Sequence, residues 1–320
     1  DTLRQGTWFS WLAGHNPLVG QQDWAAMALT MGVAALLVGA GTEAFARRDL
    51  GAVVALPGPG LPAGLAGTHG PLSRTYGELL PSALAWGAGL GTYGFVISVS
   101  ASAVADVFAK SPGLDAALAG YFPGLDISTA GGMLQFAFVD LGYLLAGLAA
   151  TSLVAARSSD ETAGRLELQL ATPLGRGRWV VASAGAVHLA VGTAVAILVI
   201  AVAAGVALSG AEAWRPATGT TILAVYAAAL SGVGVAVAGL AGARFAGTTL
   251  VAITVATSLV DLLAPALRLP DWVERLALTH HLGQPILGAW EPFGLLLCAG
   301  LAGGGIAVGA WGMRRRDLAS

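Results

Sequence analysis

The passage Arg157-Ser-Ser-Asp-Glu-Thr-Ala-Gly-Arg-Leu-Glu-Leu-Gln-Leu-Ala-Thr-Pro-Leu-Gly-Arg-Gly-Arg-Trp179 sets the organisation of the chain, because it is a long charged interruption between strongly apolar runs. Within it, Ser158 and Glu161 have the spacing of a capping box, and Pro173 marks the expected end of a short helix. This helix is too short to cross a bilayer, although one of its faces is apolar. We therefore predict that it lies at the membrane surface or docks against a partner protein. The apolar face consists of Ala163, Leu166 and Leu170.

The composition on either side of this passage is that of an integral membrane protein. Hydrophobic residues make up 56% of the chain and charged residues only 11%, whereas about a quarter of the residues in soluble proteins are charged. The mean hydropathy is +0.73. Apolar runs are longer than the roughly 18 residues that indicate a spanning helix, and the alternation expected of barrel strands does not occur in them. We predict an all-α, polytopic transmembrane helical bundle of about seven spans, with the short helix described above on one side.

The predicted spans follow directly from the apolar runs. An aromatic cluster typical of a membrane–water boundary precedes the first run. We place the spans at about 25–45, 79–107, 132–156, 180–208, 218–241, 246–266 and 293–313.

The distribution of basic residues between the loops predicts the orientation. Of the 16 Lys and Arg residues, five fall on one side and the remainder on the other. The positive-inside rule places the richer side, and with it the Glu161 segment and the C-terminus, in the cytoplasm. The residues on the richer side are Arg47, Arg48, Arg74, Arg157, Arg165, Arg176, Arg178, Arg244, Arg314, Arg315 and Arg316.

A repeat indicates a tandem duplication. The motif Arg47-Arg48-Asp49-Leu50 recurs as Arg315-Arg316-Asp317-Leu318, an offset of 317 minus 49, or 268 residues. Without gaps, the same offset also aligns 16–20 with 284–288. We expect residues 1–50 to be the last outer segment and last helix of a first copy. Residues 51–78 would be a cytoplasmic Gly- and Pro-rich linker and entry segment, and 79–320 a complete six-helix second copy.

Common catalytic and metal-binding motifs do not occur in the sequence. There is no phosphate-binding loop, and the only lysine is Lys110, so ATP hydrolysis by this chain is not expected. The adjacent His280 and His281 would point to different sides of a helix, which favours a solvated pair over a metal site. Cys298 lies alone in an apolar run. We predict no catalytic residues, no bound metal, no cofactor and no nucleic-acid partner.

Two ionisable residues, Asp140 and His188, fall well inside predicted spans. Each would lie near the middle of the hydrocarbon core, where a charge is costly, and the two side chains could meet. One interpretation places them, together with Tyr143, along a substrate path. The other, which we favour, is a buried pair that ties two helices together, or an Asp140 nearer the outer headgroups. Asp261, near the outer end of its span, is expected to be solvated.

The passage that contains Glu161 resembles the type-2 permeases of ATP-binding-cassette exporters, in particular the polyketide-antibiotic and multidrug exporter permeases. The family pattern is Glu-x-x-Gly-Arg-x-Glu-Leu-Leu-Leu-Ala-Thr-Pro, and Gln169 departs from it. Weaker matches are Gly70-Pro-Leu-Ser-Arg74 and Ser102-Ala-Val-Ala-Asp106. The resemblance implies a coupling helix that docks into a separate ATPase. The docking residues it implies are Glu161, Gly164, Arg165, Leu166, Glu167, Leu170, Thr172 and Pro173, with Ala171 also matching the pattern.

The resemblance also implies the function and the partners. It implies a permease subunit of the bacterial cytoplasmic membrane that exports hydrophobic drugs, antibiotics or lipids by alternating access. ATP and Mg²⁺ would bind to a partner ATPase dimer, and the two copies of the duplication would be permease halves. Two alternatives from the residues alone stay open. These are an ion-gradient-driven transporter that uses Asp140 and His188, and a polytopic membrane enzyme acting on lipids.

Overall fold

The computed structural model describes residues 23–46, 70–110, 125–162, 175–267 and 269–315. The chain divides into two compact units, Asp1–Gly60 and Leu61–Ser320, which are described separately. In the first unit, helix α3 (Trp24–Ala46) occupies the place of the first expected span. Its first turn is capped by Asp23, whose Oδ1 accepts a hydrogen bond from the Ala26 N–H at 2.9 Å. The apolar run of described residues within it, Trp24–Leu36, is shorter than a span.

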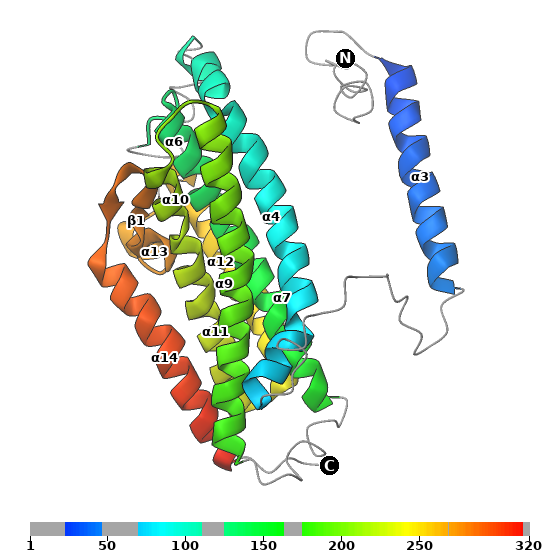
Figure 1. Ribbon diagram of the computed structural model, residues 1–320, viewed down its shortest axis with the longest axis vertical. Coiled ribbons are helices and arrows are strands. Elements are labelled where there is room, and N and C mark those ends of the chain that lie inside the picture. Colours follow the sequence, from blue (N-terminus) through cyan, green and yellow to red (C-terminus); the bar gives the residue numbers. More distant parts are fainter. Residues whose placement is uncertain (1–22, 47–69, 111–124, 163–174, 268, 316–320) are drawn as a thin grey trace. The chain divides into compact units, whose positions relative to one another are not determined.

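The second unit contains the six other spans. Long apolar helical segments run over Pro71–Ala109, Ala130–Ser158, Arg176–Leu208, Trp214–Ala241, Ala243–Ala264 and Pro292–Arg315. They confirm the prediction of an all-α polytopic bundle. Figure 1 shows these segments side by side, running alternately in opposite directions. The elements are α4 (Pro71–Ala109), α6 (Ala130–Leu134), η3 (Gln135–Asp140), α7 (Gly142–Thr162), α9 (Arg176–Leu208), α10 (Trp214–Thr220), α11 (Ile222–Ala241), α12 (Ala243–Leu267) and α14 (Pro292–Arg315).

A folded segment connects α12 to α14, and we call it the outer segment because the predicted orientation places it outside the cell. It contains α13 (Asp271–Glu274), η4 (Thr279–His281), β1 (Gly283–Gln284), η5 (Pro285–Leu287) and β2 (Ala289–Trp290). The strands β1 and β2 pair antiparallel, with Gly283 opposite Trp290. Gly288 ends η5 at φ 87°, a left-handed conformation that glycine adopts without strain.

The helices α11 and α14 pack backbone against backbone. A Cβ atom built on Gly309 would lie 2.5 Å from the carbonyl oxygen of Val235, and one built on Gly312 would lie 2.7 Å from that of Gly239. Gly305 likewise leaves no room for a Cβ against the Gly232 carbonyl. Gly305 and Gly309, which are four residues apart in the sequence, therefore both lie in a close helix contact. Small residues permit contacts of this kind in membranes.

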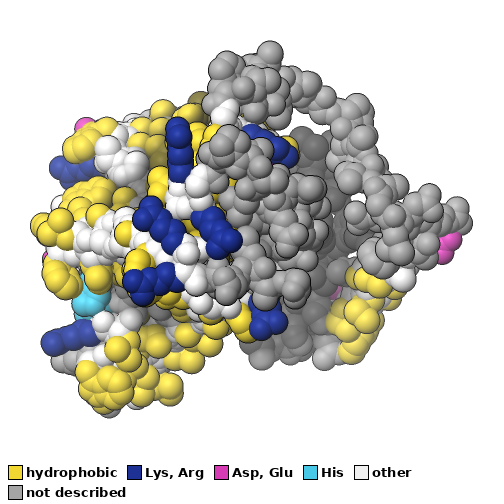
Figure 2. Space-filling view, turned by 90° about the horizontal axis from the view of Figure 1, so that it is seen from below, with side chains coloured by type: hydrophobic (Ala, Val, Ile, Leu, Met, Phe, Trp, Pro, Cys, Tyr) yellow, Lys and Arg dark blue, Asp and Glu magenta, His cyan; other side chains and the backbone are white. Residues whose placement is uncertain are grey.

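The basic side chains gather at one end of the bundle. Helices α4, α9 and α12 begin at this end and α7 and α14 finish there (Figure 1). Figure 2, which looks onto this end, shows a group of Lys and Arg side chains among the described residues. The second unit therefore brings these basic residues to one end, as the assignment of loops to two sides predicted. The described residues at the helix ends concerned are Arg74, Arg157, Arg176, Arg178, Arg244, Arg314 and Arg315.

Candidate functional site

A cavity lies at the end of the second unit that is opposite the basic side chains, between α7, α12 and the outer segment. Its volume is about 530 Å³, which falls within the range of sites for drug-sized molecules. The walls combine leucine and valine side chains with carboxyl, hydroxyl and imidazole groups. The lining residues are Leu125, Asp140, Leu141, Tyr143, Leu144, Val255, Ser258, Leu259, Asp261, Leu262, Glu274, Thr279, His280, Gly283 and Gln284.

The start of the helix that forms one wall is fixed by local hydrogen bonds. Thr129 is the N-cap of α6, and its Oγ1 accepts a hydrogen bond from the Gly132 N–H at 3.1 Å. The Asp126 Oδ1 accepts a hydrogen bond from the Ser128 N–H at 3.1 Å. Gly132 is required here, because a Cβ at this position would overlap the Asp126 carbonyl. The helix that carries Asp140 therefore begins at a defined point.

Asp140 is the last residue of the π-helical turn η3. The Leu141 N–H bonds the Phe136 carbonyl at 3.0 Å, which is the five-residue spacing of a π-turn. Gln135, which is fully buried, joins this turn to the outer segment, because its Oε1 accepts a hydrogen bond from the Ile286 N–H at 3.1 Å. Its Nε2 donates to Asp140 Oδ1 over a long 3.4 Å. A π-turn of this kind often occurs at a functional site.

Tyr143 lies one turn beyond Asp140 and also lines the cavity. Its side chain is 3% exposed and packs edge-on against Tyr226, with 4.9 Å between the ring centroids. Within the described residues, the Tyr143 hydroxyl is buried without a hydrogen-bond partner. Such a group costs free energy unless a partner reaches it. The expected proximity of Asp140 and Tyr143 is therefore present in the structure, on the wall of a cavity.

Asp261 contributes a second carboxyl group to this cavity. Its Oδ2 accepts a hydrogen bond from Thr279 Oγ1 at 2.5 Å, and its side chain is only partly exposed. The expectation of a solvated helix end at Asp261 is therefore wrong. The physical reason is that the outer segment folds back over the end of α12 and brings Thr279 onto it.

His188 does not line the cavity. Its Nε2 lies 3.0 Å from the Ala228 carbonyl oxygen on α11, and this hydrogen bond ties α9 to α11. Asp140 bonds Gln135 instead. The structure thus places Asp140 and Tyr143 together, and it gives His188 a separate role in helix packing.

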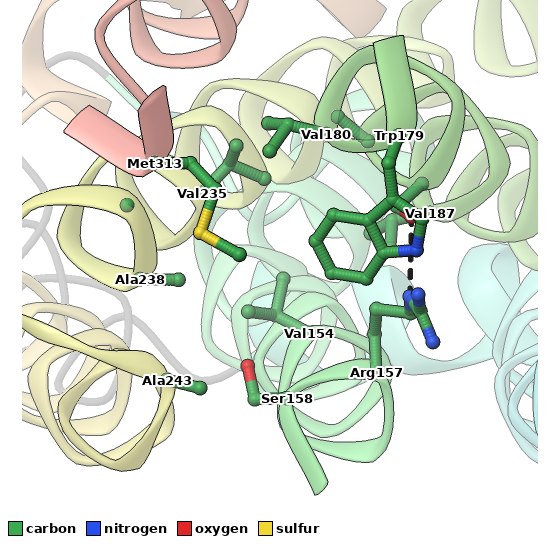
Figure 3. A pocket seen from close by; sticks show the side chains of 13 residues that line it. Val154, Arg157, Ser158, Trp179, Val180, Val187, Val235, Ala238, Ala243 and Met313 are labelled. Atoms are coloured by element: carbon green, nitrogen blue, oxygen red, sulfur yellow. Dashed lines mark hydrogen bonds between the residues drawn. The ribbon is translucent and has the colours of Figure 1, made fainter. Parts of the chain in front are cut away.

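The opposite, basic end holds a small apolar pocket of about 60 Å³ between α7, α9, α11 and α14. Arg157 on α7 lies at the edge of this pocket and reaches toward Trp179 on α9, as Figure 3 shows. The guanidinium lies 4.5 Å from the Trp179 ring centroid, and its Nε donates to Ser183 Oγ at 3.2 Å. Arg157 is 8% exposed. A stacked, hydrogen-bonded arginine of this kind fixes the two helix ends relative to each other.

The docking residues implied by the resemblance fall at the boundary of the described chain. Glu161 belongs to the last turn of α7, and its side chain is not described. The remaining predicted residues lie outside the described residues. These are Gly164, Arg165, Leu166, Glu167, Leu170, Thr172 and Pro173.

His280 and His281 form an edge-on pair with 5.5 Å between their ring centroids. His281 Nε2 lies 2.9 Å from the Arg275 carbonyl oxygen. Over the described residues, no group of three or more His, Cys, Asp or Glu side chains is arranged to hold a metal ion.

Six long apolar helices define a multi-pass membrane protein, and a cavity of drug-sized volume lies at one end of its second unit. Residues 79–314 match the family described as "Multidrug efflux system permease Rv1217c, C-terminal domain". The match covers most of the chain, and the protein therefore belongs to this family of multidrug efflux permeases. No curated protein matches the chain.

Proposed function

We propose that this chain is a transmembrane permease part of an ATP-binding-cassette exporter, which moves hydrophobic small molecules out of a bacterial cell. Membership of the multidrug efflux permease family over residues 79–314 carries this proposal. A separate ATPase dimer binds ATP and Mg²⁺, and its closure shifts the permease between inward- and outward-facing states. The other permease half and membrane lipids complete the assembly.

The basic end of the bundle supports the proposed side of ATPase docking. The helices α7 and α9 flank the segment 163–174, and both have their flanking ends at this basic end. Arg157 and Trp179 join these two ends through the stacking contact and the hydrogen bond to Ser183. A force applied between α7 and α9 would therefore reach the bundle through the Arg157–Trp179 contact.

The orientation can be tested by cysteine labelling. The native Cys298 is 0% exposed, so we expect it not to react with the labelling reagent. Glu212 lies in the outer turn between α9 and α10, and Arg244 lies at the start of α12 at the basic end. We expect Glu212→Cys in intact cells to react with a membrane-impermeant maleimide, and Arg244→Cys to react only after the membrane is opened. The reverse pattern would put the basic end outside and exclude ATPase docking there.

The coupling role is tested by Glu161→Ala and Arg165→Ala in vesicles that contain the permease and its ATPase. We expect both variants to insert normally and to lose drug transport and the stimulation of ATP hydrolysis by drug. Arg178→Ala, a charge change outside the motif pattern, is the matched control. Wild-type transport and stimulation in both motif variants would overturn the docking assignment. Transport that survives ATP depletion and collapses with an uncoupler would favour an ion-gradient-driven transporter instead.

A further inference from the structure

We infer that the outer cavity binds an amphiphilic organic cation, whose charged group lies near Asp140 and Asp261. The apolar body of the ligand would rest on leucine and valine side chains of α7 and α12. The identification of this ligand as a transported substrate rests on the proposed function. The binding itself does not, and it can be measured without an ATPase.

The first observation is the charge of the cavity wall. The lining carries three carboxyl groups, from Asp140, Asp261 and Glu274, and it contains no Lys or Arg. Asp140 and Asp261 lie on the walls of the same cavity, together with Glu274 and His280. Among the described residues, neither aspartate forms a salt bridge. A carboxylate at membrane depth is costly without a counter-charge, so this wall favours a positively charged ligand.

The second observation is the hydroxyl group of Tyr143. It is buried, lies on a cavity-lining residue and has no hydrogen-bond partner within the described part of the chain. A buried polar atom of this kind indicates a partner that the protein itself does not supply. The electron-rich face of an aromatic ring also attracts an organic cation. Tyr143 therefore points to a ligand independently of the carboxyl groups.

The third observation separates an organic cation from a metal ion. The described carboxyl and imidazole groups do not converge on one point as metal ligands do. The volume of about 530 Å³ is instead that of a site for a drug-sized molecule. Leu144, Val255 and Leu259 supply apolar surface on the same walls. Dispersed acids on an apolar wall match a bulky cation with a delocalised or shielded charge.

The test compares two probes of nearly equal size and opposite charge, tetraphenylphosphonium and tetraphenylborate. Each is titrated against the full chain in lipid nanodiscs by equilibrium dialysis, with empty nanodiscs as the blank. We expect saturable binding of tetraphenylphosphonium and none of tetraphenylborate. Asp261→Asn and Asp140→Asn should each weaken phosphonium binding by about tenfold, because each removes one partner of the ligand's charge.

The matched control is Asp106→Asn, which makes the same charge change at the outer end of α4. Asp106 is exposed and does not line the cavity. The Asp106→Asn variant should therefore bind tetraphenylphosphonium with unchanged affinity. If Asp261→Asn does not fold, Glu274→Gln on the cavity rim replaces it, with an expected loss of about threefold. Tyr143→Phe should also weaken binding, because it removes the unpaired hydroxyl.

Besides the absence of phosphonium binding, two results would overturn the inference. One is saturable binding of tetraphenylborate as tight as that of the phosphonium ion, which would show an apolar site without charge selection. The other is an equal loss of affinity in Asp106→Asn and Asp261→Asn, which would show a general surface effect. ATP-driven export of a neutral drug without phosphonium binding would reject this inference and leave the proposed function standing. Phosphonium binding without ATP-driven export would reject the proposed function and leave this inference standing.

Discussion

Replacing Gly309 by Ala should force α11 and α14 apart. A Cβ at this position would lie 2.5 Å from the Val235 carbonyl oxygen and 2.8 Å from its Cγ1. Ordinary contact begins at 3.4 Å, so the new methyl group is too close by 3.4 minus 2.5, or 0.9 Å. The oxygen belongs to a helix backbone and cannot rotate away. The two helices must therefore separate by most of this distance.

The cost follows from the length of the contact that separates. A gap of about 0.5–1 Å removes roughly a quarter to a half of the dispersion energy of each atom pair. Gly232, Gly239 and Gly312 lie along the same seam and lose contact together with Gly309. Overpacking of this kind usually costs about 1–3 kcal/mol. Part of this cost is offset by the helix propensity of alanine, which exceeds that of glycine by about 1 kcal/mol.

The control is Gly304→Ala, five residues earlier on the same helix. A Cβ at Gly304 meets nothing within 4 Å, so this variant gains the same propensity without a clash. Equilibrium unfolding in mixed detergent micelles gives the free energy of unfolding of both variants. We expect Gly309→Ala to be less stable than Gly304→Ala by about 2 kcal/mol. A difference below about 0.5 kcal/mol would refute the backbone contact between the two helices.

Three further changes test the rest of the structure by thermal unfolding. Gln135→Met keeps the side-chain volume but leaves the Ile286 N–H without its acceptor, and we expect a loss of about 1–3 kcal/mol; unchanged stability would contradict that bond. A double-mutant cycle of Arg157→Met and Trp179→Leu should give a coupling energy of about 1–2 kcal/mol, and a value near zero would remove the stacking contact. Gly132→Ala should destabilise the start of α6, because no space for a Cβ exists there; a melting temperature equal to that of the wild type would show that the turn adapts.

The approximate positions of the six spans of the second unit could be read from the sequence, because the bilayer thickness fixes the length of an apolar helix. The ends of the helices could not be read from the sequence. The first span of the second unit was expected to begin at 79, and α4 begins at Pro71. Its first turns are polar, with Arg74 and Glu78 forming an exposed salt bridge at 3.0 Å. Polar residues that continue a helix beyond the membrane leave no mark in an apolar pattern.

The candidate site was only partly predictable. Asp140 and Tyr143 are three residues apart, and helix periodicity brings such residues onto one face. The partners from distant segments could not be foreseen, because the Gln135–Ile286 and Asp261–Thr279 contacts depend on how the outer segment folds back. The π-turn also changes the helical register within the span, and ordinary periodicity does not reveal it.

The helical segment formed by α6, η3 and α7 joins the two ends of the second unit. The helical segment Ala130–Ser158 carries Asp140 in the cavity wall and Arg157 at the basic end, 17 residues apart, or about 25 Å at 1.5 Å per residue. If the equilibrium of the basic contact is coupled to the cavity, the coupling free energy must be the same when measured from either site. The Trp179→Leu variant should then bind tetraphenylphosphonium with an affinity that differs from that of the wild type by about fivefold or more. Equal affinities in the two proteins would show that the cavity and the basic end act independently, whatever the ATPase does.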